Sequence, residues 1–288
     1  MATGWRAAWT VTLLLLAACL LPDLAGFVPA DAGDASDAGD GAARDVSTVD
    51  VTPIEAGVPD GAILYFPFEE GVATSTADKS GNGNDGILVG GGAMAWTTSG
   101  KIGNALAFNV APVDGGAFVD IPASKSSTLA VTGSFSVTAW IFATSAPVDD
   151  ATIVSNLLFS PTTPGGFQLD TTIDKGPRAL GFKLSNPADA GGGVFARYGA
   201  TVFKLDTWYF VAGVYDATAL TLHVYVDGKL DDGALAGSVL SEFPKSPLDV
   251  HIGHRPSSKL SNFSGTIDEV RVYPRALSDV EIAGLFLQ

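Results

Sequence analysis

Residues 135–142, Phe-Ser-Val-Thr-Ala-Trp-Ile-Phe, give the clearest structural signal in the chain. Successive side chains of a strand point to opposite faces, so one face would hold a phenylalanine, a valine, an alanine and an isoleucine. The other face would begin with serine and threonine and end with tryptophan and phenylalanine. We therefore predict a central strand that is half exposed at its start and buried on both faces at its end.

Similar short alternations recur between clusters of Gly, Asp, Asn and Pro, and no helical periodicity separates them. This pattern predicts an all-β sandwich. The other predicted strands are Ile63–Phe68, Ala105–Phe108, Ala117–Ile121, Ala151–Ser155, Gly166–Thr171, Ala179–Leu184, Val194–Tyr198, Trp208–Tyr215, Leu220–Val226, Asp249–Ile252 and Gly265–Tyr273.

Two local signals mark a turn and a helix. Asp227-Gly228 follows Leu220–Val226 and suits the positive φ angles of a tight hairpin turn. Near the end of the chain, Ser278 precedes Glu281 by three residues, which is the spacing of a capping box. We therefore predict a hairpin at 220–228 and a short C-terminal helix from Asp279 to Phe286.

The composition excludes several classes of function. The chain has 288 residues, with 16 Lys and Arg against 31 Asp and Glu, and a formal net charge of −15. This balance argues against a nucleic-acid partner held through phosphate contacts. The single cysteine, Cys19, excludes an intrachain disulfide and a zinc site with several cysteine ligands.

Residues 1–19 are typical of an export signal, with Arg6 followed by an apolar run that ends at Ala17-Ala18-Cys19. The stretch Leu16–Cys19 resembles a bacterial lipoprotein signal, in which the cysteine is lipid-modified. The resemblance implies a protein of the cell envelope, anchored to the outer membrane through lipid on Cys19 alone. The alternative is an ordinary secretory signal cleaved near Ala25, which would release the protein.

The segment that follows differs in composition from the rest of the chain. Residues 22–61 contain eight aspartates and one glutamate against a single arginine, mostly among Ala, Gly and Ser. Such a sequence cannot bury enough apolar surface to fold, so we predict a disordered tether at 20–60. Residues 61–288 then form one domain.

Several segments resemble, in order, the laminin-G-like modules of the concanavalin A-like family. The most specific is 263–278, Phe-Ser-Gly-Thr-Ile-Asp-Glu-Val-Arg-Val-Tyr-Pro-Arg-Ala-Leu-Ser, which resembles the family's closing strand and helix. The resemblance implies a two-sheet antiparallel jelly-roll sandwich with a short C-terminal helix. It implies little about the ligand, because this fold carries lectins, carbohydrate-binding modules, adhesive domains and glycoside hydrolases. The other matching segments are 78–86, 103–108, 135–140, 208–212 and 222–228.

The resemblance also implies a structural calcium ion between the N-terminal segment and an acidic residue of the last strand. Asp268 is at that acidic position, and Asp78 and Asn82 are candidate ligands from the loop 78–86. Carboxylate and amide oxygens are suitable ligands for calcium. The alternative is a plain turn at 78–86 and no metal at Asp268.

Catalytic patterns are weak. A glycosidase needs two carboxylates about 5–9 Å apart, but Glu69-Glu70 and Asp268-Glu269 are adjacent pairs whose members would point to opposite faces of a strand. The same rule predicts opposite faces for His251 and His254, which are three residues apart. We therefore expect no catalytic residue.

These observations favour a non-catalytic recognition module that binds a glycan or an extracellular protein. One alternative is a divergent glycoside hydrolase or polysaccharide lyase, and another is a structural or adhesive domain without a small ligand. Recognition groups are expected on loops over a rigid scaffold. The predicted recognition loops are 145–150, 156–165, 186–193 and 255–262.

Overall fold

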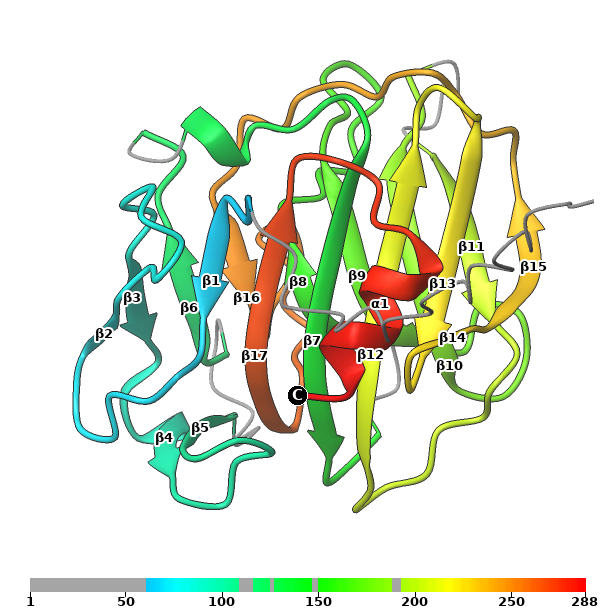
Figure 1. Cartoon of the computed structure of the whole chain (residues 1–288). Coiled ribbons are helices and arrows are strands. Elements are labelled where there is room, and N and C mark those ends of the chain that lie inside the picture. Colours follow the sequence, from blue (N-terminus) through cyan, green and yellow to red (C-terminus); the bar gives the residue numbers. More distant parts are fainter. Residues whose placement is uncertain (1–60, 109–115, 125–126, 147–149, 188–192) are drawn as a thin grey trace, which may run out of the picture. The chain divides into compact units, whose positions relative to one another are not determined.

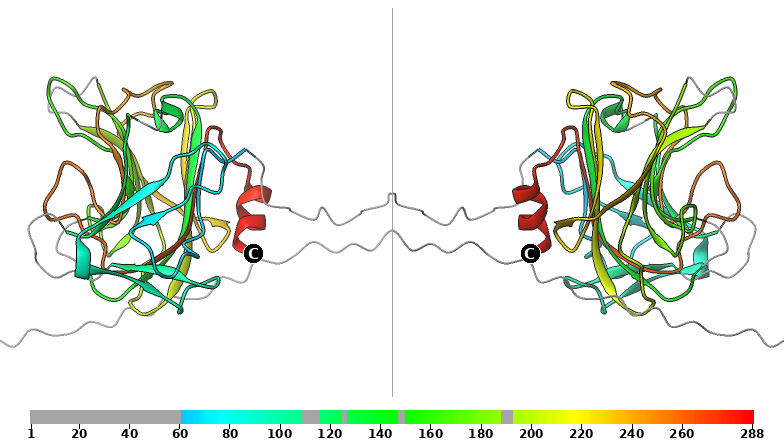
Figure 2. Two further views of the ribbon diagram at one scale, coloured as in Figure 1. Left: turned by 90° about the vertical axis from the view of Figure 1, so that its left-hand side faces the viewer. Right: turned by 90° about the vertical axis from the view of Figure 1, so that its right-hand side faces the viewer.

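The computed structural model describes residues 61–288 except 109–115, 125–126, 147–149 and 188–192. Its strands form two antiparallel sheets that lie face to face (Figures 1 and 2). The predicted two-sheet antiparallel jelly-roll sandwich is therefore confirmed. The predicted signal with Cys19 and the predicted tether at 20–60 lie outside the described residues.

The first sheet has eight strands and contains β7, the strand that 135–142 predicted. β7 lies between β12 and β17, so its predicted central position is confirmed. The strands are, in spatial order, β14 (Lys229–Leu230), β13 (Thr221–Val226), β12 (Trp208–Asp216), β7 (Phe135–Ala143), β17 (Gly265–Tyr273), β5 (Ala105–Phe108) and β4 (Met94–Thr97), with β1 (Leu64–Phe66) paired to β17.

The second sheet has nine strands, and β8, β9, β10 and β16 lie in its middle. The strands are, in spatial order, β15 (Asp232–Ala236), β11 (Val194–Gly199), β10 (Ala179–Ser185), β9 (Phe167–Thr172), β8 (Ala151–Ser155), β16 (Val250–Ile252), β6 (Phe118–Ile121), β3 (Gly86–Val89) and β2 (Ser75–Thr76). Two short 3₁₀ helices, Gly91–Ala93 and Ser127–Leu129, lie in the connections.

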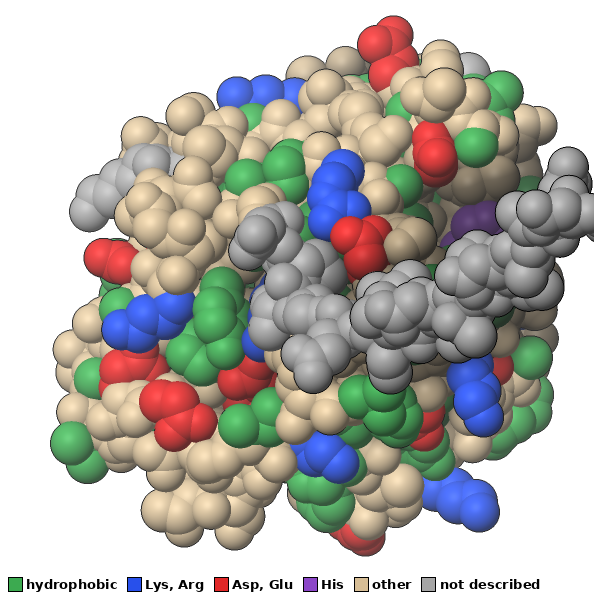
Figure 3. Space-filling model, in the orientation of Figure 1, with side chains coloured by type: hydrophobic (Ala, Val, Ile, Leu, Met, Phe, Trp, Pro, Cys, Tyr) green, Lys and Arg blue, Asp and Glu red, His purple; other side chains and the backbone are tan. Residues whose placement is uncertain are grey.

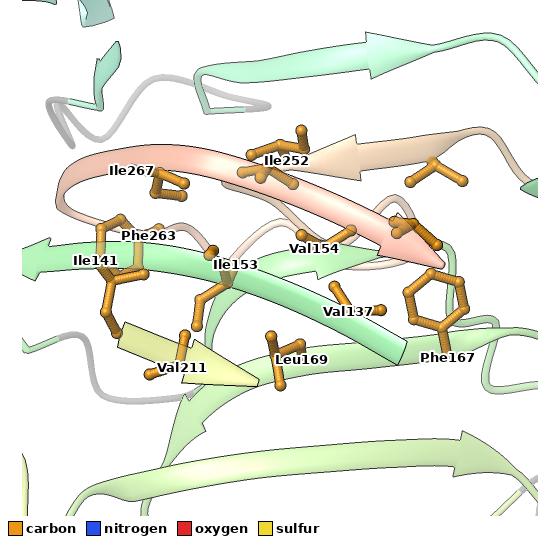
Figure 4. Close-up of a cluster of buried hydrophobic side chains, with 14 of the residues drawn as sticks. Val137, Ile141, Ile153, Val154, Phe167, Leu169, Val211, Ile252, Phe263 and Ile267 are labelled. Atoms are coloured by element: carbon orange, nitrogen blue, oxygen red, sulfur yellow. The ribbon is translucent and has the colours of Figure 1, made fainter. Parts of the chain in front are cut away.

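The main core lies between the two sheets (Figure 4). Val137 and Ile141 of β7 and Ile267 of β17 face Leu169 of β9 and Ile252 of β16, and all are buried. The central strands of the second sheet therefore turn their apolar positions inward. Their alternate positions point away from the core, on the other side of the sheet.

The other face of the eight-stranded sheet is covered by α1 (Asp279–Phe286) (Figures 1 and 2). Ile282 and Leu285 of α1 pack with Trp140 and Phe210 in a second apolar cluster. The predicted capping box is confirmed. The Ser278 side chain accepts a hydrogen bond from the Glu281 amide, and the Glu281 side chain accepts one from the Ser278 amide. In Figure 3, acidic and basic side chains are interspersed on this side of the domain.

The described residues, 61–288 with their four gaps, contain no helix long and apolar enough to cross a membrane.

The prediction that β7 is half exposed at its start is wrong. Ser136 and Thr138 are fully buried. The Ser136 hydroxyl donates to the Arg275 carbonyl oxygen at 2.9 Å and accepts from the Leu277 amide at 2.9 Å. The segment that leads into α1 therefore supplies both hydrogen-bond partners of the Ser136 hydroxyl.

The predicted hairpin is confirmed, because β13 and β14 pair around Asp227 (φ 49°) and Gly228 (φ 74°). The short strands β2, β3, β4, β14 and β15 were not predicted. β15 lies at a sheet edge and is mostly exposed, so it lacks the apolar alternation that marks a buried strand.

Candidate functional site

The side of the nine-stranded sheet that points away from the core carries polar and charged side chains. In β9, Gln168 and Asp170 alternate with buried apolar residues, and Lys183 of β10 lies directly opposite Gln168. The cross-strand pairing therefore gathers these groups on one surface. We call this surface the polar face and define it by Asp120, Gln168, Asp170, Lys183, Tyr198 and His251.

Lys183 is the centre of a buried ion cluster on the polar face. Its Nζ lies 2.9 Å from Asp150 Oδ1, 3.1 Å from Asp170 Oδ2 and 2.8 Å from Asp174 Oδ2. The Gln168 amide donates to Asp150 Oδ2 at 3.2 Å and also to Asp170. Asp150 precedes β8 and Asp174 follows β9, so Lys183 joins two loops to the sheet.

The cluster changes the protonation of its members. Burial raises the pKa of Asp170 to about 7, against the opposing attraction of Lys183. Burial alone would lower the pKa of Lys183, but Asp170 and Asp150 outweigh it and raise that pKa above its ordinary value. Lys183 is therefore charged at neutral pH, whereas burial favours the protonated form of Asp170.

A second group of rings lies on the same face. Phe118 stacks on His251 with ring centroids 4.1 Å apart and on His254 at 5.2 Å. The two histidines face each other, with 3.4 Å between their Nδ1 atoms. Burial, followed by the effect of His254, lowers the pKa of His251 to about 4. Burial also lowers the pKa of His254, so both rings are neutral at pH 7.

The prediction that His251 and His254 point to opposite faces is therefore wrong. The strand rule applies only while the backbone stays extended, and Gly253 between them has a φ of 86°. A Cβ on Gly253 would lie 2.5 Å from the Phe108 ring, so only glycine fits this turn. The turn brings the second imidazole back beside the first.

Three of the four predicted recognition loops meet beside the polar face. Arg255 Nη1 donates to Asp150 Oδ2 at 3.2 Å, and the Arg255 guanidinium lies 5.1 Å from the centroid of the Phe159 ring. The Ser257 hydroxyl donates to the Leu157 carbonyl oxygen at 2.8 Å. We call this meeting point, defined by Asp150, Phe159 and Arg255, the Arg255 junction. In the fourth loop, 188–192 lie outside the described residues.

Unpaired polar atoms concentrate around these groups. Among the residues described, Asp120 Oδ1, Thr152 Oγ1, Asp170 Oδ1, Ser185 Oγ and Arg255 Nε are buried without a hydrogen-bond partner. Buried polar atoms are normally paired, and those that are not require water, an ion or a ligand. Phe159 in turn is 42% exposed. The Arg255 junction thus combines a half-exposed ring with one guanidinium nitrogen, Arg255 Nε, that has no hydrogen-bond partner among the described residues.

The structure does not bring the three predicted calcium ligands together. Asp78 accepts four hydrogen bonds, from the amides of Tyr65, Ser80 and Asn84 and from the Ser80 hydroxyl. Asn82 donates to the Ala62 carbonyl oxygen and to Ser80 Oγ.

Asp268 contacts a different loop. Its Oδ2 accepts from the amides of Lys101 and Ile102 at 2.9 and 3.0 Å, and its Oδ1 accepts from the Glu269 amide. Burial raises the pKa of Asp268 to about 7. No group of three His, Cys, Asp or Glu in the described parts of the chain is arranged to hold a metal. The calcium site therefore stays a prediction.

Sequence reasoning missed the Lys183 cluster, although part of its signal was present. Gln168 and Lys183 each stand between apolar residues in predicted strands, and Asp170 is two positions from Gln168, so the strand rule places all three on the outer side of the sheet. The other two carboxylates come from loops, whose positions the strand pattern does not give.

The cluster makes stability depend on pH in a definite direction. The pKa of Asp170 is about 7 in the folded chain against an ordinary 3.8. Between these values the folded state binds a proton that the unfolded state releases, so this group makes the free energy of unfolding fall as pH rises.

Replacing Lys183 by methionine should lower the free energy of unfolding by about 3–5 kcal/mol at neutral pH, because it leaves buried carboxylates without their cation. The loss should shrink as the pH falls towards that ordinary carboxyl pKa, since the carboxyl of Asp170 then takes up a proton in the folded state. Urea unfolding followed by tryptophan fluorescence at several pH values measures both effects.

The matched control is Lys175→Met, on an exposed position of the neighbouring loop, where the expected change is within about 0.5 kcal/mol. A loss for Lys183→Met that equals this control, or that does not depend on pH, would contradict the role given to Lys183.

Comparison with known proteins agrees with this architecture. Domain 4 of AbnA, an extracellular GH43 arabinanase from Geobacillus stearothermophilus solved with arabinotriose, has a TM-score of 0.55 at 19% identity over 78% of this chain and 98% of its own. The binding domain of botulinum neurotoxin serotype G gives 0.56 at 14% identity, over 78% of this chain and 50% of its own. A sialidase from Trypanosoma rangeli gives 0.52 at 19% identity, over 80% of this chain and 33% of its own.

The chain thus spans nearly all of the arabinanase domain, half of the neurotoxin binding domain and a third of the sialidase. At these identities the likeness concerns the fold alone. No curated protein sequence matches the chain. Residues 113–283 do match the family model of the concanavalin A-like lectin/glucanases superfamily. Together with the two antiparallel sheets, this match establishes that the chain belongs to that superfamily.

Proposed function

We propose that residues 61–288 form a non-catalytic recognition module that binds a carbohydrate at the Arg255 junction. The observation that carries the proposal is the meeting of three loops, at Asp150, Phe159 and Arg255, beside the polar face. Ligand sites commonly combine apolar or aromatic surface with a few convergent polar groups. The half-exposed ring of Phe159 offers a face on which a sugar ring can stack, and the Arg255 guanidinium beside it offers hydrogen-bond donors for the sugar hydroxyls.

The similar structures support a carbohydrate as the ligand class. The arabinanase domain that covers most of this chain was solved with arabinotriose. The likeness to a neurotoxin binding domain supports the runner-up, which is recognition of an extracellular protein. We favour the carbohydrate because the Arg255 guanidinium beside the Phe159 ring is a hydrogen-bonding group, which matches sugar hydroxyls better than an apolar protein surface.

The state of the carboxylates supports the non-catalytic part of the proposal. A glycosidase needs two carboxyl groups that reach opposite sides of the scissile bond. Asp150 and Asp170 are buried, and both are held by the Lys183 ammonium, which lies within 3.1 Å of each. In this arrangement neither carboxyl group is accessible to a sugar. Hydrolysis of a bound glycan by the wild type, lost in Asp170→Asn, would favour the glycoside hydrolase alternative.

The proposal predicts that Phe159→Ala weakens glycan binding by at least ~10-fold, the equivalent of about 1.4 kcal/mol. The ligand is first identified by screening the protein on a glycan array, and its affinity is then measured by isothermal titration calorimetry. The melting temperature should be unchanged, because Phe159 is exposed. Leu230→Ala, at an exposed position of β14 in the other sheet, is the matched control.

An array without any binder would overturn the carbohydrate assignment. Equal affinities of Phe159→Ala and Leu230→Ala for an identified glycan would show that the glycan does not bind at the Arg255 junction.

We also propose that the protein is held in the cell envelope by lipid on Cys19. This residue is the single cysteine of the chain and follows an apolar run. Acyl chains hold a protein to a membrane without a spanning helix. Cys19→Ser is therefore expected to move the protein from the membrane fraction to the soluble fraction, with Ser36→Ala in the predicted tether as control. Unchanged partitioning would refute the anchor.

A structural calcium ion is a separate proposal, with Asp78, Asn82 and Asp268 as its candidate ligands. An ion that binds only the folded state raises the melting temperature by mass action. Melting is therefore expected at a higher temperature in calcium than in a chelator, and Asp268→Asn should abolish the difference. The same melting temperature in both buffers would contradict the proposed calcium site.

A further inference from the structure

A hollow opens between the two sheets at the end of the sandwich where β7 and β9 finish and β12 begins. It contains about 430 Å³ of space, including its open mouth. Its wall is largely apolar and is formed by Ile141, Ala143, Ala146, Phe203, Leu205 and Tyr209.

The sequence explains why the core is not filled here. Deeper in the sandwich, the inward positions of β7 and β9 carry Ile141 and Leu169, which lie in the core between the two sheets (Figure 4). The next inward positions carry Ala143 and Thr171, which are smaller. The space that these two side chains leave is the hollow, and both of them line it.

Aromatic rings and backbone bonds hold the wall in place. Phe203 and Tyr209 pack with ring centroids 4.7 Å apart. The Phe203 amide donates to the Arg178 carbonyl oxygen at 2.9 Å, and the Lys204 amide donates to the Tyr209 hydroxyl at 3.3 Å. Leu205 is 46% exposed and extends the apolar wall to the surface.

The charged side chains among the described residues that line the hollow are both cations. Of the described residues that line it, the two that carry charge are Arg178 and Lys204, in a chain whose net charge is −15. Arg178 Nη1 donates to the Thr171 carbonyl oxygen at 2.7 Å and to Thr171 Oγ1 at 3.3 Å, which fixes the guanidinium at the wall. Lys204 is exposed. Two cations beside an apolar space favour an anionic group there over a neutral or cationic one.

We propose that this hollow binds a small amphiphilic anion, with its apolar body between Ala143 and the Phe203–Tyr209 rings and its acidic group beside Arg178 and Lys204. The site is distinct from the Arg255 junction. Thr171 faces the hollow from the core side of β9, whereas its neighbour Asp170 belongs to the polar face on the opposite side. The proposal therefore does not depend on carbohydrate binding.

Two chemical sources share this description, namely aromatic acids and fatty acids. Calorimetric titration of the full chain with naphthalene sulfonate and with decanoate separates them, and naphthalene methanol and decanol serve as the uncharged analogues. Saturable binding of one site per chain by either anion supports the proposal. The tighter anion identifies the source.

Two variants locate the site. Ala146→Trp places an indole at the exposed rim and should weaken binding of the preferred anion by at least ~10-fold, or about 1.4 kcal/mol. Ala219→Trp, at an exposed alanine in the turn between β12 and β13, should leave binding unchanged. Lys204→Glu should weaken binding of the anion and leave binding of its uncharged analogue unchanged. Because Lys204 is exposed, this substitution should leave the fold intact.

The proposal is overturned if neither anion binds saturably, or if Ala146→Trp and Ala219→Trp bind alike. Equal effects of Lys204→Glu on the anion and on its uncharged analogue would also overturn it. Melting temperatures of the three variants, measured alongside, exclude unfolding as the cause of any loss.

Discussion

Strand register in the nine-stranded sheet is the constraint on which both the core and the polar face depend. Leu169 and Phe182 must point inward to fill the core, so their neighbours Asp170 and Lys183 must point outward. A slip by one residue would place charges between the two sheets. Since loops also bury the outward side, the charges there have to be compensated locally. The ion cluster around Lys183 is therefore a consequence of the same register that builds the core.

Much of the fold was predictable because its signals are local. The alternation in 135–142 and 265–273, the Asp227-Gly228 turn and the capping box of α1 each depend on a few consecutive residues. The burial of Ser136 was not predictable in this way, since it depends on the segment 275–277, more than a hundred residues away.

The candidate site was less accessible to sequence reasoning for a related physical reason. Its loops were expected to carry the recognition residues. Their convergence on Arg255, however, depends on the pairing of β9, β8 and β16 as neighbours in the sheet. The pairing of His251 with His254 depends on a single positive φ angle at Gly253. Membership of the superfamily predicts the fold but not the ligand, because proteins as different as an arabinanase domain and a neurotoxin binding domain have a similar fold.

The position of α1 and β1 has a consequence for how the domain meets a partner. The described chain begins at Gly61, just before β1, and β1 belongs to the sheet whose outer side α1 covers. That side is covered by the domain's own helix, whereas loops cover the central polar residues on the outer side of the opposite sheet. The Arg255 junction therefore lies beside the sheet that α1 does not cover.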